Sequence, residues 1–374
     1  MATHTPHFPD LLFPGAARLR RWEGLLMGLL ADAGYAELRS SLVMREPHEK
    51  ASLRFFDGDH LLALRWDYTT ALARMLSKRF AEPPPRVSYA GAVFRRANQP
   101  WEPVERFEVG CERIHTDKTS RDEADVELAR LLMAVPKTLG LRASILQIGS
   151  AALLRSPMEH ERLPAPLAEA VTRALLRRAP HRVKEALGDH PAAPRLLAHV
   201  ETLLSEFDGV GGLQALDRSP YAGLLKDERE HLRKTLEALS PFVPEGLQLR
   251  LDLADVQGLD FYTGPTLRLY APGAQQELAA GGRYDGLYPE LGKPWFAAGF
   301  CVRLSPLLDL AETRPDLFDA AMNEGDRPVA SLPLLPPIGR LRALPLARLA
   351  EVGALPSCSP RGVRAKPDHH VCGS

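Results

Sequence analysis

The sequence predicts an α+β fold, in which an antiparallel sheet is flanked by helices and receives a helical insertion. Residues 247–253 alternate apolar and polar side chains, which is the period of a strand with one buried face. Residues 86–95 and 106–115 have the composition of two strands joined by a loop. Residues 156–240 differ, because they are rich in Ala, Leu and Arg, carry helical patterns and give no strand signal. This block is therefore predicted to be an insertion into the sheet-based fold.

Composition and charge limit the class of protein. The hydrophobic fraction of 45% and the charged fraction of 25% are those of a soluble globular protein, and 47 basic residues against 47 acidic ones do not indicate a nucleic-acid binder. The start of the chain has no secretory pattern, and no apolar run is long enough to span a bilayer. The four cysteines lie far apart, which favours reduced thiols in a cytoplasmic protein. Their spacing relative to the histidines near the end of the chain matches no metal-ligand pattern, so we expect neither a metal nor a cofactor.

Local patterns predict the first elements in order. Residues 18–33 carry a stripe of Leu and Trp at helical spacing, and residues 55–60 form the turn of a hairpin. Residues 61–65 then run as a strand toward a helix over 70–80. Asp67 is the residue type that caps such a helix, so a purely structural role for it is a strong alternative to a functional one.

Later segments complete the pattern. A helix is predicted over residues 121–139, with acidic side chains in its first turn. Within the insertion, helical periodicity covers residues 166–178, 194–207 and 222–239. Residues 266–270 are predicted to return as a strand after a Thr-Gly-Pro turn, and residues 295–310 to pass from a strand into a helix.

Two short motifs carry the functional signal. Residues 258–264 read Gly-Leu-Asp-Phe-Tyr-Thr-Gly, and residues 281–287 read Gly-Gly-Arg-Tyr-Asp-Gly-Leu. Either motif alone is compatible with an ordinary hairpin that has a tyrosine-rich edge. Together they resemble the two histidine-recognition motifs of histidyl-tRNA synthetases. The resemblance covers roughly residues 8–312, and residues 86–115 and 295–310 look like motifs 2 and 3 of class II aminoacyl-tRNA synthetases.

The resemblance implies a class II synthetase-like sheet and a set of residues that hold free histidine. Asp67 and Thr69 fall where the family holds the amino group. Glu108 stands where the family has a glutamine, which changes a neutral side chain into an acceptor that is normally charged. The histidine-binding residues implied in this way are Asp67, Thr69, Glu108, Glu112, Tyr262, Arg283 and Tyr284.

The nucleotide side of the same resemblance is incomplete. Arg95 keeps the place of the family arginine that grips the α-phosphate of ATP. Ala97 replaces a glutamate that contacts adenine, while Gln257 and Pro306 each replace an arginine. Removing one preorganised donor at such a centre typically costs about 10²–10³ in rate. We therefore expect a protein that binds histidine and barely activates it.

The domain organisation follows from the same comparison. Residues 1–312 are expected to form the synthetase-like core, including the insertion at about 156–240. Residues 313–374 are rich in Pro, Arg, Leu and Ala and have little periodicity, so we expect an irregular tail. About sixty such residues do not make the anticodon-binding domain of a histidyl-tRNA synthetase.

A synthetase-like core with a weakened nucleotide site resembles the regulatory subunit of ATP phosphoribosyltransferase. That family is non-catalytic and acts with a short-form catalytic subunit in the first step of histidine biosynthesis, conferring feedback inhibition by L-histidine. The resemblance further implies a homodimer within a hetero-octamer, in the cytoplasm, with no tRNA and no membrane as partners. Two alternatives stay open: a weak or specialised histidyl-tRNA synthetase or other adenylate-forming enzyme, and a stand-alone histidine-sensing module.

Overall fold

The structure is a computed structural model of the 374-residue chain. The chain divides into two compact units, residues 1–327 and 328–374, and every residue described below lies in the first. The structure describes residues 10–12, 14–45, 52–96, 103–117, 120–205, 210–258 and 261–319.

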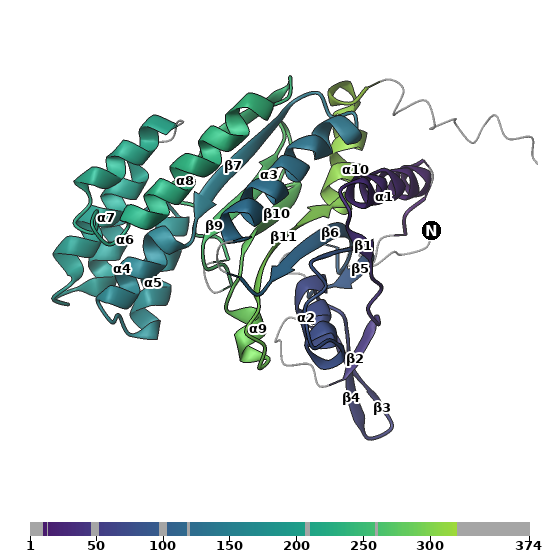
Figure 1. Ribbon diagram of the computed structural model, residues 1–374, viewed down its shortest axis with the longest axis horizontal. Coiled ribbons are helices and arrows are strands. Elements are labelled where there is room, and N and C mark those ends of the chain that lie inside the picture. Colours follow the sequence, from purple (N-terminus) through teal and green to yellow (C-terminus); the bar gives the residue numbers. More distant parts are fainter. Residues whose placement is uncertain are drawn as a thin grey trace, which may run out of the picture. The chain divides into compact units, whose positions relative to one another are not determined.

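An eight-stranded mixed sheet forms the centre of the fold (Figure 1). Its strand order is β1-β5-β6-β11-β10-β9-β7-β8. The six inner strands pair antiparallel, as predicted, whereas β1 pairs parallel with β5 and β8 pairs parallel with β7 at the two edges. The strands are β1 (Ala36–Glu37), β5 (Arg86–Phe94), β6 (Glu105–His115), β7 (Ser144–Ser150), β8 (Leu247–Leu251), β9 (Pro265–Tyr270), β10 (Ala279–Arg283) and β11 (Phe296–Arg303).

The order of the last strands differs from the simplest sequence-based expectation. The predicted strands at 247–253 and 266–270 exist as β8 and β9, but they are not neighbours. Strand β7 lies between them, parallel to β8 and antiparallel to β9. The turn between β8 and β9 therefore belongs to a longer connection that crosses β7, which a pattern confined to 247–270 does not reveal.

A separate small sheet has the order β2-β4-β3. Its strands are β2 (Val43–Arg45), β3 (Arg54–Asp57) and β4 (His60–Leu64), and the predicted turn at residues 55–60 joins β3 to β4. Strand β4 leads directly to helix α2 (Tyr68–Arg79), which also confirms the predicted strand and helix in this region.

The two faces of the large sheet contact different hydrophobic cores. Val109 and Cys111 of β6 belong to the larger core, which includes side chains of α1 (Gly15–Asp32), α3 (Arg121–Thr138) and α10 (Leu304–Thr313). On the opposite face, β5 and Ile114 of β6 pack with α2 and with Tyr284 and Tyr288, the latter in helix α9 (Leu287–Glu290). Because side chains alternate along a strand, Glu108 and Glu112 share the face of Ile114.

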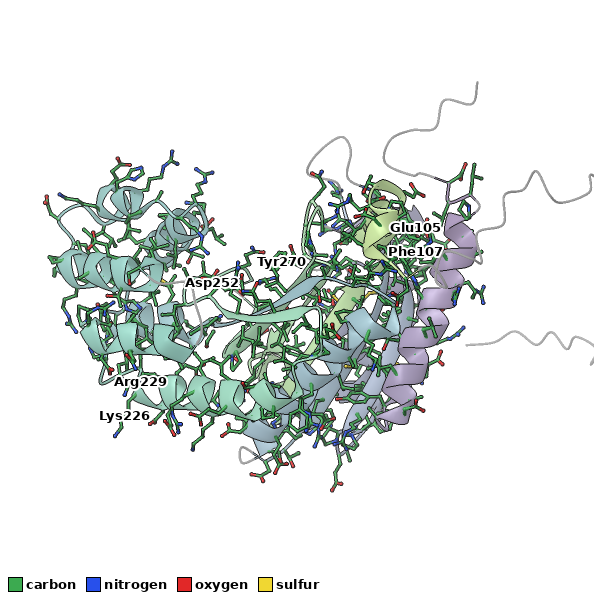
Figure 2. All side chains as sticks on the ribbon, turned by 90° about the horizontal axis from the view of Figure 1, so that it is seen from above. Glu105, Phe107, Lys226, Arg229, Asp252 and Tyr270 are labelled. Carbon is green, nitrogen blue, oxygen red and sulfur yellow. The ribbon has the colours of Figure 1, made fainter. Side chains whose placement is uncertain are left out.

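The helical insertion is confirmed and contains more helices than the sequence predicts. It consists of α4 (Ala152–His160), α5 (Ala165–Leu176), α6 (Pro180–Leu187), α7 (Ala193–Leu204), the 3-10 helix η2 (Val210–Arg218), α8 (Lys226–Leu239) and the short 3-10 helix η3 (Ser240–Phe242). Figure 2 shows Lys226 and Arg229 at the start of α8, on the side of the insertion, and Asp252 at the end of β8 beside it. Helix α8 packs along α3 and so joins the insertion to the sheet.

The beginning of the predicted irregular tail is ordered against the core. The 3-10 helix η4 (Pro315–Leu317) follows α10, and Phe318 is buried and forms an isolated bridge with Leu141. Residues 320–374, with the remainder of the predicted tail, lie outside the described residues. None of the helices in the described part of the chain has the length and apolar character needed to cross a bilayer.

Candidate functional site

Asp67 caps the helix that follows it, as its residue type predicts. It is the N-cap of α2, and its Oδ1 atom accepts a hydrogen bond from the backbone N–H of Thr70 at 2.5 Å. Its second oxygen, Oδ2, is buried and has no hydrogen-bond partner among the described residues. Burial raises the pKa of Asp67 to about 6, and the nearby charge of Glu108 adds to the effect while Arg95 opposes it. One oxygen thus caps the helix, and the other is a buried acceptor that the cap does not use.

Glu112 lies at the centre of a hydrogen-bonded group drawn from three separate elements. The Thr69 hydroxyl, in the first turn of α2, donates to Oε1 at 2.7 Å, and the Tyr284 hydroxyl donates to Oε2. Glu112 is only 2% exposed, and this burial raises its pKa to about 8, with a smaller contribution from Asp67. Burial therefore favours the neutral form of this carboxyl group, and a nearby cation would favour the charged form.

Two aromatic residues border this group. Tyr262 lies in the connection before β9, and burial raises its pKa well above the usual value for a phenol. Phe261 stacks on Tyr284 with ring centroids 4.8 Å apart and meets Tyr262 edge-on at 5.3 Å. These apolar surfaces and buried hydroxyls are suited to a flat, polar ring such as imidazole.

Arg283 is placed differently from the other predicted residues. It follows the glycines of β10, but its guanidinium reaches Asp125 of α3 in a buried ion pair. His231 of α8 also contacts Asp125, through Nε2 at 2.8 Å, and its Nδ1 lies 2.9 Å from Asp122. The structure therefore brings Arg283 into a charged cluster between the sheet and the insertion, away from Glu112.

This cluster contains residues whose role was missed from the sequence. The sequence pattern indicates Asp125 only as a favourable charge near the start of a helix, and no motif includes His231. Their partners lie 158 and 106 residues away along the chain. A weak signal exists, since Asp122 and Asp125 are three residues apart and so share one face of α3.

The residues on the predicted nucleotide side contact other residues of the same chain. Arg95 follows β5, and its Nη2 atom lies 3.0 Å from Oε1 of Glu108, while Nε donates to the carbonyl of Trp66 at 2.8 Å. The carbonyl of Gln257 accepts from Arg268 at 2.6 Å. Pro306 occupies the first turn of α10, where a proline fits. Ala97 lies outside the described residues.

The starts of β6 and α10 are tied together at this side. The backbone N–H of Phe107 donates to the Ser305 hydroxyl at 3.3 Å, and Figure 2 shows Glu105 and Phe107 beside α10. By resemblance, Ser305 and Pro306 stand where the family has a Glu-Arg pair, and the hydroxyl of Ser305 is used in this contact with β6. No group of three or more potential metal ligands occurs in the described part of the chain, and the cysteines and histidines near its end lie outside that part.

This chain is similar to known proteins in sequence. The family profile of histidyl-tRNA synthetase matches residues 7–307. Among curated proteins, an ATP phosphoribosyltransferase regulatory subunit from Anaeromyxobacter dehalogenans is 35% identical over 250 residues, which cover 65% of this chain and 69% of that protein.

Solved structures share the fold. A protein from Bacillus halodurans described as an ATP phosphoribosyltransferase regulatory subunit/histidyl-tRNA synthetase aligns with a TM-score of 0.71 at 22% identity, covering 83% of each chain. A chain of the ATP phosphoribosyl transferase (HisG:HisZ) complex from Thermotoga maritima aligns with a TM-score of 0.60 at 16% identity, covering 78% of this chain and 98% of that one. At these identities, the two alignments establish the class II synthetase-like fold.

Proposed function

The chain belongs to the family of ATP phosphoribosyltransferase regulatory subunits, which share the histidyl-tRNA synthetase fold, and we propose that it regulates that enzyme as a non-catalytic subunit that senses L-histidine. Its partner is a short-form catalytic subunit, which supplies the active site for the first step of histidine biosynthesis. A second copy of the chain completes the assembly, as a homodimer within a cytoplasmic hetero-octamer. Feedback inhibition acts through histidine bound near Glu112.

One asymmetry carries this proposal. The amino-acid side keeps buried carboxyl groups at Asp67 and Glu112, which suit an ammonium group, and the hydroxyls of Thr69 and Tyr284 around them. On the nucleotide side, Arg95 is the one family arginine that the resemblance retains, and the nearby Glu108 offsets its charge. Such a site is able to hold a small amine with an imidazole ring, but it offers little to a triphosphate.

The rate cost of this asymmetry argues against an active synthetase. Adenylation builds negative charge at the α-phosphate, and an arginine aimed at a transferring phosphate is worth roughly 10³–10⁵ in rate. Gln257 and Pro306 stand at two such positions by resemblance, and neither carries a charge. Binding without activation is the property that a sensor requires.

Regulation requires that histidine bind the two states of the assembly with different affinity. A ligand with equal affinity for both states shifts nothing, however tightly it binds. We therefore expect calorimetry to give different histidine affinities for the isolated subunit and for its complex with the catalytic subunit. Equal affinities would contradict this mechanism.

The direct experiment is co-purification with the short catalytic subunit, followed by an activity assay with and without histidine. The expected result is a stable complex that is more active than the catalytic subunit alone and that histidine inhibits. Histidine-dependent exchange of pyrophosphate into ATP by this chain alone would instead support a synthetase. Stable histidine binding with no association with the catalytic subunit would support a stand-alone sensor.

A matched pair of variants tests where histidine acts. Thr69→Val removes the hydroxyl that donates to Glu112 and should weaken inhibition by histidine while the complex still assembles. Thr172→Val removes a comparable hydroxyl, which donates to the Ala168 carbonyl within α5, and should leave inhibition unchanged. Equal inhibition of both variants would place the inhibitory histidine elsewhere.

A further inference from the structure

Three acidic side chains lie close together on the face of the sheet around Glu112. Asp67, Glu108 and Glu112 lie close enough for their charges to influence one another, and Glu108 and Glu112 are each 2% exposed. A free amino acid brings one ammonium group and one carboxylate. The carboxyl groups of this cluster suit the ammonium group. The carboxylate of the ligand needs a cation, and the nearby arginines are the candidates.

Three arginines surround Glu108, and each already has partners. Arg65 donates to the Tyr68 hydroxyl and to the backbone carbonyls of Ser40 and Ala92. Arg303 lies opposite Glu108 across β6 and β11, and its Nη1 atom is 2.7 Å from Oε1 of Glu277.

Arg95 differs from these two arginines in what holds it. Its Nη2 atom is 3.0 Å from Oε1 of Glu108, yet this oxygen makes no hydrogen bond of good geometry within the described part of the chain. Arg95 is 22% exposed on its side chain, so a ligand is able to reach it. Next to Arg303, in contrast, the cavity lined by Glu108 and Ser305 has a volume of about 30 Å³, which is room for little more than one water. Arg95 is therefore the cation that a ligand carboxylate is best able to use.

We propose that Glu108 is a specificity-determining residue that competes with the carboxylate of the bound amino acid for Arg95. In the unliganded protein Glu108 neutralises Arg95 from within. A ligand carboxylate has to displace this contact and then lies beside a buried negative charge, which costs affinity. A ligand with the same imidazole and amine but no carboxylate avoids that cost. This inference rests on the proposed function, because it assumes that histidine binds near Glu112.

Histidine and histamine form the matched pair of probes, since they differ only by the carboxylate. Wild-type protein should bind histamine within about tenfold of histidine, because Glu108 offsets what the carboxylate gains at Arg95. Glu108→Gln keeps the size of the side chain and removes its charge. Because the variant removes the negative charge beside the ligand carboxylate, it should tighten histidine binding by about tenfold or more and leave histamine binding unchanged or weaker.

Glu127→Gln is the control. Glu127 lies on α3 and pairs with Arg86 of β5 at 2.7 Å, and it is not part of the cluster around Glu112. It should leave both affinities unchanged. The measurement is isothermal calorimetry with each ligand, with thermal unfolding to verify that each variant is folded.

The outcomes separate this inference from the proposed function. If wild-type protein binds no histidine, the proposed sensing role fails and this inference fails with it. If wild-type protein binds histidine but folded Glu108→Gln leaves the ratio of the two affinities unchanged, only the role of Glu108 is overturned. The wild-type comparison needs no variant, and a preference for histidine over histamine clearly greater than about tenfold would also overturn the role of Glu108.

Discussion

Gly299 on β11 lies directly opposite Glu112 on β6, and a methyl group added at Gly299 would overlap the carboxylate oxygen Oε2 of Glu112. The backbone carbonyl oxygen of Cys111 would also lie too close to the same methyl group. The absence of a side chain at residue 299 is therefore what allows a carboxyl group to lie flat against the sheet, within reach of Thr69 and Tyr284.

The first prediction concerns this contact. Gly299→Ala should displace Glu112 from Thr69 and Tyr284 and abolish histidine binding in calorimetry, and it should also lower the melting temperature because the Cys111 backbone cannot move aside easily. Gly24→Ala on the exposed side of α1 meets no atom within 4 Å and is the control. It should bind histidine normally and gain about 0.5–1 kcal/mol in stability. Normal histidine affinity in Gly299→Ala would contradict the proposed position of the ligand.

The second prediction concerns protons released on binding. Burial raises the pKa of Glu112 to about 8 and that of Asp67 to about 6, so the free site is partly protonated at pH 7. An ammonium group favours the charged carboxylate and lowers both pKa values, so histidine binding should release protons and should tighten as the pH rises from 6 to 8. Calorimetry in two buffers of different ionisation enthalpy measures this release. Net proton uptake would show that the ammonium does not meet these carboxyl groups.

The third prediction concerns the contact between the insertion and α3. Burial by itself would lower the pKa of His231, but the hydrogen bond and charge of Asp125 outweigh it and the pKa is raised. The stabilisation is therefore complete below the unfolded pKa of about 6.5 and is lost as the pH rises through the higher folded value. His231→Gln should cost about 1 kcal/mol at pH 6 and clearly less at pH 9.

Urea unfolding at the two pH values measures this difference. His60→Gln, at an exposed position of the β3–β4 hairpin, is the control and should have no effect at either pH. A cost for His231→Gln that does not change between pH 6 and pH 9 would mean that the contact depends on packing and not on charge.

The fourth prediction concerns a buried ion pair between β9 and the connection that precedes it. Arg268 of β9 contacts Asp255 at 2.9 Å, and both side chains are at most 3% exposed. Arg268→Met leaves Asp255 buried without its cation and should cost about 3–5 kcal/mol of unfolding free energy. Arg173→Met removes an exposed ion pair with Glu169 in α5 and should cost less than about 1 kcal/mol. Chemical denaturation measures the loss of unfolding free energy in each variant. Similar losses in the two variants would contradict the argument from burial.

Local patterns were sufficient for most elements and for the family. Periodicity placed α1, α2, α3 and the two long strands β5 and β6 within a few residues of their bounds, because each buries one face of a regular element. The motifs at 258–264 and 281–287 carried the family resemblance, which the family profile over residues 7–307 confirms. The assignment of individual residues to histidine binding stays a prediction.

Contacts between distant strands were beyond the reach of those patterns. Strand β7 lies between β8 and β9, although no periodic signal near residues 247–270 requires a third strand there. Arg283 is part of a recognisable motif, but its partner Asp125 is 158 residues away.

The sequence by itself determined the class of fold and the family, because these depend on residue identity and on local spacing. By resemblance it also predicts that Gln257 and Pro306 replace two arginines. Only the tertiary structure decided that Glu108 faces Arg95, that Gly299 makes room for Glu112, and that Arg283 turns to Asp125. The physical reason is that burial and charge pairing arise between side chains from separate strands and helices, and the chain has to fold before those side chains meet.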